Sequence, residues 1–197
     1  PGGTGGGTVR GTPTTDANGV ASLPSWTLGQ TAGAGNNVVT AAVAGLTGSP
    51  VTFTATGTAG NAATRVANSA QTQSATVGTA VAAPPSVVVR DQYGNAVGAG
   101  ENVTFAVTAA AAGGTIDPAA TGATNSAGIA TLNSWILGTA AGTSNNTVTA
   151  TISGHNTNTF TRSATASGAS QIVITTQPSA TATAGVPFAQ QPVLALR

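Results

Sequence analysis

Four carboxylic acids, one histidine and five arginines are the side chains of this 197-residue sequence suited to acid–base or ionic chemistry. General acid–base catalysis needs such groups within hydrogen-bond reach of the reacting atoms, and a calcium site needs six to eight oxygen ligands. Asp91 and Asn95 form a close pair of oxygen donors on either side of Tyr93-Gly94. The other acids and the histidine are Asp16, Glu101, Asp117 and His155.

The pair Asp91 and Asn95 has two interpretations. The first is a pair of calcium ligands, and the second is an Asx-type turn whose side chains bond local backbone groups. Because the sequence has so few carboxylates, we predict the turn. A calcium ion bound between units through backbone carbonyls and Asn side chains stays open at this stage.

Several reactive residue types are absent from the sequence. Cys and Met do not occur, and all five basic residues are Arg. This composition excludes disulfides, zinc–thiolate sites, cysteine nucleophiles, Schiff bases, a P-loop lysine and Lys–Asn isopeptide crosslinks. Five arginines are too few for the basic stripe of a nucleic-acid-binding protein. We therefore predict a protein that is not an enzyme, with no catalytic, cofactor-binding or metal-binding residues and no cofactor.

The sequence contains an internal repeat. Residues 15–29 (TDANGVASLPSWTLG) match residues 124–138 (TNSAGIATLNSWILG) at an offset of 109 positions. A loop shorter by two residues then changes the offset to 107, at which Phe53 matches Phe160. One unit therefore contains about 108 residues. Further matches join Asn36-Asn37 to Asn145-Asn146, Gly78 to Gly185, Pro85 to Pro192 and Arg90 to Arg197.

The repeat predicts one complete and two partial units. Residues 1–60 form the C-terminal part of one unit, residues 61–168 form a complete unit, and residues 169–197 form the N-terminal strands of a third. The sequence begins with Pro rather than Met and shows no leader pattern, so we expect residue 1 not to be a native N-terminus. We expect a piece of a longer tandem array, or the ordered part of an assembly.

Alternating apolar and polar residues predict β-strands throughout the chain. The alternation, with 40% hydrophobic residues, argues against a disordered linker, and no apolar run reaches the roughly 18 residues of a membrane span. We predict residues 109–112 (AAAA) as a loop, and no helix elsewhere. Short strands separated by turns predict an all-β chain of tandem Greek-key sandwiches. The clearest strands are residues 51–56, 87–89, 102–107, 147–152, 172–174 and 194–196.

Four motifs in order carry a resemblance to a known family. They are residues 89–97 (VRDQYGNAV), 101–105 (ENVTF), 124–130 (TNSAGIA) and 141–150 (AGTSNNTVTA). In this order and spacing they resemble the bacterial immunoglobulin-like repeats of invasin- and intimin-type surface proteins. The resemblance implies extracellular immunoglobulin-like sandwiches that act as spacers in an adhesin or surface fibre. Asn125, where the family has Asp, and the tryptophans at 26 and 135 depart from its pattern.

Trp26 and Trp135 occupy the same position in two units. They could be stacking platforms for a glycan or large aromatic residues in a sandwich core, and the repetition favours the core. Trp135 is then one of eight residues that we predict to be largely buried in the complete unit. These are Val103, Phe105, Val107, Leu132, Trp135, Val148, Ile152 and Phe160.

For the histidine, the alternating threonines and the two glycosylation sequons, we predict no functional role. His155, in the loop of residues 154–158, corresponds to Leu46 and has no acidic or metal-binding neighbours, so we predict that it is inert. Threonines alternate at positions 52, 54, 56 and 58, and again at 157, 159 and 161. Such a regular row could form an ice-binding surface, but we favour a solvent-facing strand. The sequons at Asn102 and Asn145 receive little weight.

The two partial units predict how the ends behave. Residues 1–60 lack their opening strands, so Leu23, Val39, Val43 and Phe53 would line an open groove, whereas strands 172–175 and 193–197 would have nothing to pair with. The predicted partners are therefore adjacent repeats or copies of the chain, joined head to tail by strand complementation. The predicted function is an extracellular or cell-surface adhesin stalk or a fibre subunit. The alternative function is a glycan- or ice-binding module. A glycan ligand could also bind at a tip of the parent protein that lies outside this sequence. We expect neither nucleic-acid binding nor a membrane span in this segment.

Overall fold

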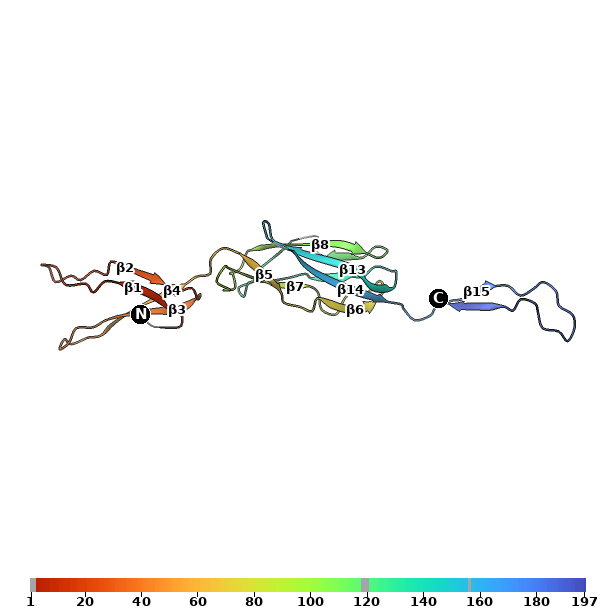
Figure 1. Ribbon diagram of the computed structural model, residues 1–197, viewed down its shortest axis with the longest axis horizontal. Coiled ribbons are helices and arrows are strands. Elements are labelled where there is room, and N and C mark those ends of the chain that lie inside the picture. Colours follow the sequence, from red (N-terminus) through yellow and green to blue (C-terminus); the bar gives the residue numbers. More distant parts are fainter. Residues whose placement is uncertain (1–2, 118–120, 156) are drawn as a thin grey trace.

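The computed structural model describes residues 3–117, 121–155 and 157–197, so that residues 1–2, 118–120 and 156 lie outside the description. The regular secondary structure of the described residues is β-strand, arranged in several sheets. Strands β1–β4 lie at one end of an elongated chain, β5–β14 lie in the middle, and β15–β16 lie at the other end (Figure 1). The predicted all-β fold is confirmed, and no described helix is long and apolar enough to cross a membrane.

The middle part is a sandwich of two sheet layers. One layer is five-stranded in the order β10-β8-β13-β14-β6, where β14 and β6 are parallel and the other pairs are antiparallel. The other layer contains β11-β7-β5 and the pair β12-β9. The strands are β5 (Thr64–Ala67), β6 (Thr72–Thr76), β7 (Ser86–Arg90), β8 (Asn102–Ala110), β9 (Thr115–Asp117), β10 (Thr121–Ala123), β11 (Ile129–Thr131), β12 (Ser134–Ile136), β13 (Gly142–Thr151) and β14 (Asn158–Thr165).

One hydrophobic core fills the space between the layers. Alternate residues of β8, β13 and β7 point into it because successive side chains of a strand face opposite ways. Of the eight predicted core residues, all are buried except Val107, which is half-buried and packs against the rest. The other buried apolar residues are Val81, Val87, Val89, Val97, Ala130, Leu137, Ala150 and Ala164.

The prediction of a loop over residues 109–112 is wrong for its first half. Strand β8 continues to Ala110, since Ala109 lies opposite Thr147 and Ala110 opposite Asn146 of β13. Pairing with the neighbouring strand decides the conformation of these alanines, whose own propensity favours a helix. The turn begins only at Ala111, and Ala112 has a positive φ of 57°.

The first part repeats half of this sandwich. It contains β1 (Gly7–Arg10), β2 (Ser25–Leu28), β3 (Gly33–Ala41) and β4 (Val51–Gly57), paired as β1-β2 and β3-β4. Val9 pairs with Trp26 as Ile116 pairs with Trp135. Phe53, however, is 52% exposed, whereas its counterpart Phe160 is fully buried. The alternation along β4 thus predicts the strand, but the described residues leave its apolar face uncovered.

The last part is a hairpin of β15 (Ile172–Thr176) and β16 (Val193–Leu196). We predicted these strands with nothing to pair against, and that is wrong, since they pair with each other. Ile172 lies opposite Leu196, as Arg65 lies opposite Val89 in the pair β5-β7. The hairpin forms because this antiparallel pair needs no other part of the unit. Its large apolar side chains are nevertheless exposed, among them Ile172, Ile174, Leu194 and Leu196.

Candidate functional site

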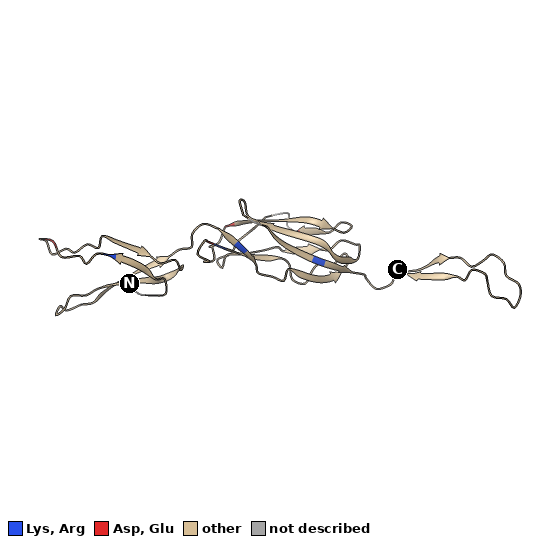
Figure 2. Ribbon diagram, viewed as in Figure 1, with Lys and Arg blue, Asp and Glu red and all other residues tan. Residues whose placement is uncertain are grey.

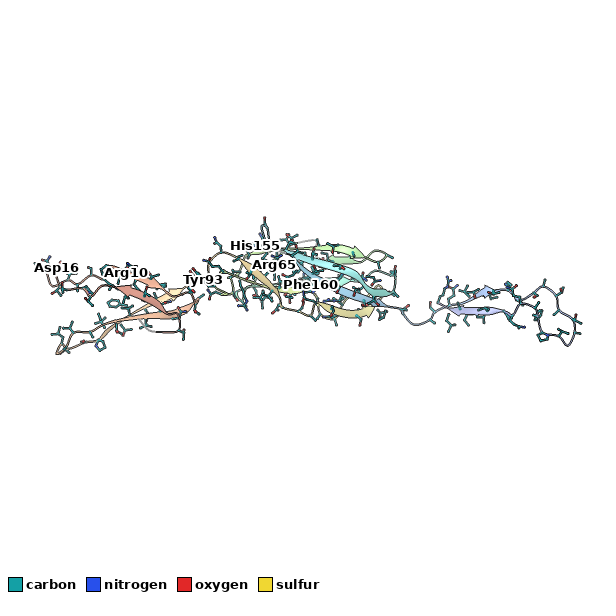
Figure 3. The ribbon with its side chains drawn as sticks, in the orientation of Figure 1. Arg10, Asp16, Arg65, Tyr93, His155 and Phe160 are labelled. Atoms are coloured by element: carbon teal, nitrogen blue, oxygen red, sulfur yellow. The ribbon has the colours of Figure 1, made fainter. Side chains whose placement is uncertain are left out.

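The turn after β7 contains Asp91 and Asn95. The backbone N–H groups of Tyr93 and Asn95 both donate to Asp91 Oδ1 at 2.9 Å, and the Asp91 N–H donates to the Asn95 carbonyl at 2.9 Å. Gly94 supplies the positive φ of 85° that closes this turn. The predicted Asx-type turn is therefore confirmed. Figure 3 places Tyr93 of this turn where the first part of the chain meets the middle part.

The same turn holds the preceding unit. The Asn95 side-chain amide donates to the carbonyl of Gln30 at 2.7 Å, and its Oδ1 accepts the N–H of Ala32 at 2.9 Å. Gln30 and Ala32 lie in the loop between β2 and β3. One carboxamide thus satisfies an acceptor and a donor of the same backbone segment, which only a side chain with both functions can do. We call this contact the Asn95 joint.

The segment between the two units is fixed by the other oxygen of Asp91. The N–H of Gly60 donates to Asp91 Oδ2 at 2.9 Å, and Asn95 Nδ2 donates to the same oxygen at 2.9 Å. The Asn95 side-chain bond, followed by the Gly60 N–H bond, lowers the pKa of Asp91 to about 2. Both oxygens of this buried carboxylate accept N–H groups, which a calcium ion would have to displace. The arrangement stabilises a charged carboxylate by hydrogen bonds alone.

Two buried asparagines shape the loop that Asn95 holds. Asn36 Nδ2 donates to the Thr31 carbonyl at 2.7 Å, and Asn37 Nδ2 donates to Asn36 Oδ1 at 2.8 Å. The Gly29 N–H then donates to Asn37 Oδ1 at 2.9 Å. These bonds occupy the irregular start of β3, where the register with β4 shifts. They fix the backbone on both sides of the joint segment through contacts within the first unit.

The complete unit repeats this network. Asn145 Nδ2 donates to the Ala140 carbonyl at 2.8 Å, Asn146 Nδ2 donates to Asn145 Oδ1 at 3.0 Å, and the Gly138 N–H donates to Asn146 Oδ1 at 3.0 Å. The sequence showed the two Asn pairs as matching positions, but their role was missed. The signal was a pair of polar residues at positions that alternation assigns to a strand. The Asn145 sequon is part of this internal network.

Trp135 lies in the core, as we predicted. It is fully buried, and the guanidinium carbon of Arg162 lies 5.1 Å from the ring centroid. Arg162 is also fully buried and donates to the carbonyls of Gln71, Thr161 and Ala70. Burial lowers the pKa of Arg162. Trp135 is therefore not a glycan platform, and the burial of Arg162 was not foreseen from the sequence.

Trp26, by contrast, lies beside an open groove in the first part of the chain. This groove has a volume of about 740 Å³ and is lined mainly by apolar side chains. They include Val9, Leu23, Trp26, Val39, Val43 and Phe53. The counterpart of Arg162 at this place is Ala55, so the charged group that covers the ring of Trp135 is absent from the described residues around Trp26.

The remaining titratable side chains are dispersed along the chain (Figure 2). His155 lines one shallow depression with Arg65 and another with Glu101, and Figure 3 places His155 near Arg65. Asp16 accepts the N–H groups of Asn18 and Val20 in an exposed turn. Within the described ranges, no group of three or more His, Cys, Asp or Glu side chains is placed to hold a metal ion. Of the loop around His155, residue 156 lies outside the description.

Asn125 forms the same turn as Asp16. Its Oδ1 accepts the N–H groups of Ala127 at 2.9 Å and Ile129 at 3.1 Å. The departure from the family pattern at this position therefore leaves the turn intact, because a carboxamide oxygen replaces the carboxylate oxygen as acceptor.

Comparisons with known proteins give a distant structural likeness. No family model matches the chain, and no curated protein matches it. Among solved structures, it is similar to the surface layer protein SbsC, domains 4–9, at 16% sequence identity and a TM-score of 0.38. The likeness covers 87% of this chain and 27% of that chain.

Proposed function

We propose that this chain is a non-enzymatic structural segment of a large extracellular bacterial surface protein, in which consecutive sandwich units form an adhesin stalk. The extracellular location and the adhesin role rest on the resemblance to invasin- and intimin-type repeats. The spacer role rests on the molecule itself. Its function is to keep one unit at a fixed distance and angle from the next.

The Asn95 joint is the observation that carries this proposal. A flexible tether between domains leaves the two facing surfaces free, whereas here one side chain binds both Gln30 and Ala32 across the boundary. Asp91 holds Gly60 of the connecting segment at the same place. Each such bond contributes about 0.5–1.5 kcal/mol net, and together they restrict rotation of one unit against the other.

The repeat extends the argument to further units. The loop that receives Asn95 is shaped by Asn36 and Asn37, and the same bonds recur around Asn145 and Asn146. The complete unit therefore presents the same loop, residues 139–141, at its own far end. A series of such units would carry the same joint at each boundary and would form a straight or regularly twisted rod.

The test is a distance measurement across the joint in the full chain. Because the sequence lacks Cys, spin labels can be placed at two exposed positions, Thr27→Cys in β2 and Thr104→Cys in β8. We expect a narrow distance distribution that Asn95→Ala broadens. The control is Gln92→Ala, an exposed residue of the same turn, which should leave the distribution narrow.

A broad distribution in the unmodified chain would contradict the rod. So would a narrow one that persists in Asn95→Ala. Thermal unfolding of each variant shows that the β5–β14 sandwich is intact, so that a loosened joint is distinguished from a damaged unit.

A further inference from the structure

Two neighbouring strands of the middle part connect it to the rest of the chain in opposite directions. Strand β6 is the second strand of the complete unit, and β14 is its last. They pair in parallel, from Thr72 opposite Thr161 to Thr76 opposite Thr165. We propose that this parallel pair is a mechanical clamp, which lets the unit resist tension applied along the chain. This function rests on the proposed stalk, because a stalk between a cell and a bound surface is pulled at both ends.

The parallel direction decides how tension acts on the pair. Tension from the preceding unit reaches the N-terminal end of β6, and tension from the following residues reaches the C-terminal end of β14. In a parallel pair these two ends lie at opposite ends of the ladder, and both strands point toward the C-terminal hairpin in Figure 1. The strands are therefore pulled past each other along their axes, and the ladder bonds must break together. In an antiparallel pair the same two ends would lie side by side, and tension would open the ladder one residue pair at a time.

Side chains and flanking backbone groups add bonds at the beginning of the ladder. Arg162 Nη1 donates to the Gln71 carbonyl at 3.0 Å, and Arg162 Nη2 donates to the Ala70 carbonyl at 3.2 Å. The N–H of Thr161 donates to the same Gln71 carbonyl at 2.8 Å, and Gln71 Nε2 donates to the Thr159 carbonyl at 3.3 Å. These bonds join β14 to the residues through which tension enters β6.

The far end of the ladder is closed in the same way. Thr165 Oγ1 donates to the Ala75 carbonyl at 3.2 Å, and the Val77 N–H donates to the Thr165 carbonyl at 2.9 Å. Strand β14 ends at Thr165, where the chain continues toward β15. The last residue of this strand is thus bound to β6 and its extension by both its side chain and its backbone.

The burial of Arg162 gives a second reason to assign it to the clamp. Burying a guanidinium is costly, and apolar residues of similar volume often stabilise a fold equally well. An apolar side chain cannot, however, supply the donors that bind β14 to the carbonyls of Ala70 and Gln71. The counterpart of Arg162 in the preceding unit is Ala55, so the repeat does not require an arginine at this position. Arg162 therefore adds a specific connection between the two strands on which tension acts.

Strand β5 precedes β6 in the chain and receives the tension first. It pairs with β7 of the other layer, from Thr64 opposite Arg90 to Ala67 opposite Val87. Its release frees only a short segment and leaves β6 paired with β14. We therefore expect a short first extension and then the main event, in which residues 72–165 extend by roughly 300 Å at about 3.3–3.6 Å per residue.

The first test pulls the full chain in two directions by single-molecule force spectroscopy. Handles at the two ends of the chain pull the strands of the clamp along their axes. Handles at Thr72→Cys and Thr159→Cys, exposed residues at the beginning of β6 and β14, pull the two strands apart across the ladder. At the same loading rate, we expect the sandwich to open at a several-fold lower force in the second geometry. Thermal melts of the Cys variant should match those of the unmodified chain.

The second test measures the lifetime of the unit at a constant force. Arg162→Met keeps an apolar side chain of similar length but removes the donors to Ala70 and Gln71. The loss of two hydrogen bonds should shorten the lifetime by roughly 5–150-fold. The control is Arg65→Met, which removes the bond of 3.2 Å from β5 to the Ala150 carbonyl and should leave the lifetime before the main event unchanged.

Equal unfolding forces in the two pulling directions would overturn the clamp. An Arg162→Met lifetime equal to that of the unmodified chain would overturn the role of Arg162. The comparison of directions leaves Arg162 unchanged, so it stays decisive even where that variant fails to fold. The stalk has its own test, because the spin-label distances report the Asn95 joint without tension. A loose joint would therefore contradict the stalk and leave the unfolding force of the sandwich unchanged.

Discussion

Replacing Trp135 by Ala tests whether the repeated tryptophan is a core residue. The side chain is fully buried and packs under the guanidinium of Arg162 at 5.1 Å. Truncating a large buried aromatic residue costs about 3–5 kcal/mol, because apolar contact is lost and a cavity remains. Arg162 loses its aromatic cover as well, so we expect a value toward the upper end. Since a domain of this size is stable by roughly 5–15 kcal/mol, this loss removes a substantial part of the stability of the unit.

The assay is urea denaturation of the full chain followed by circular dichroism, with Trp26→Ala as the matched control. Trp26 stands at the same position of the repeat but lines an open groove. Its loss should leave the transition of the β5–β14 sandwich unchanged. A destabilisation by Trp135→Ala below about 1 kcal/mol would place this side chain outside the core and refute the reasoning.

Two further predictions concern the joint and the loop that shapes it. The pKa of Asp91 is lowered to about 2, so its contribution to the joint is present above the ordinary carboxyl pKa of about 4 and is lost as pH falls toward 2. The spin-label distribution should broaden in that window, and an unchanged distribution at pH 2 would contradict the role of the carboxylate. Gly138→Ala should strongly destabilise the middle part in thermal melts, because a Cβ atom would overlap the Ala111 carbonyl. Gly98→Ala, where a Cβ atom meets nothing within 4 Å, should be nearly neutral, and equal melting temperatures for the two variants would contradict the packing.

The sequence could predict strands and turns because their signals are local. Alternation along residues 102–107 and 147–152 needs only neighbouring positions, and both strands are present in the structure. The turn at Asp91 is set by residues within four positions of it. The repeat then carries each local prediction to a second place in the chain.

Contacts between distant residues decided the rest. Asn95 binds Gln30 and Ala32, which lie more than 60 positions earlier, and nothing local to Asn95 distinguishes that role from an ordinary turn. From the sequence alone, Arg162 would be taken for a solvent-exposed strand residue. In the structure its guanidinium donates to the carbonyls of Ala70 and Gln71.

By itself, the sequence determined the all-β class, the repeat, the turns and the core position of Trp135, since all depend on residue type and spacing. The tertiary structure alone decided three features. It extended β8 through Ala110 by pairing with β13, it paired β15 with β16, and it made Asn95 a contact between units. In each case a hydrogen-bond partner is brought close only by the folded chain, and a backbone group that finds such a partner overrides local preference.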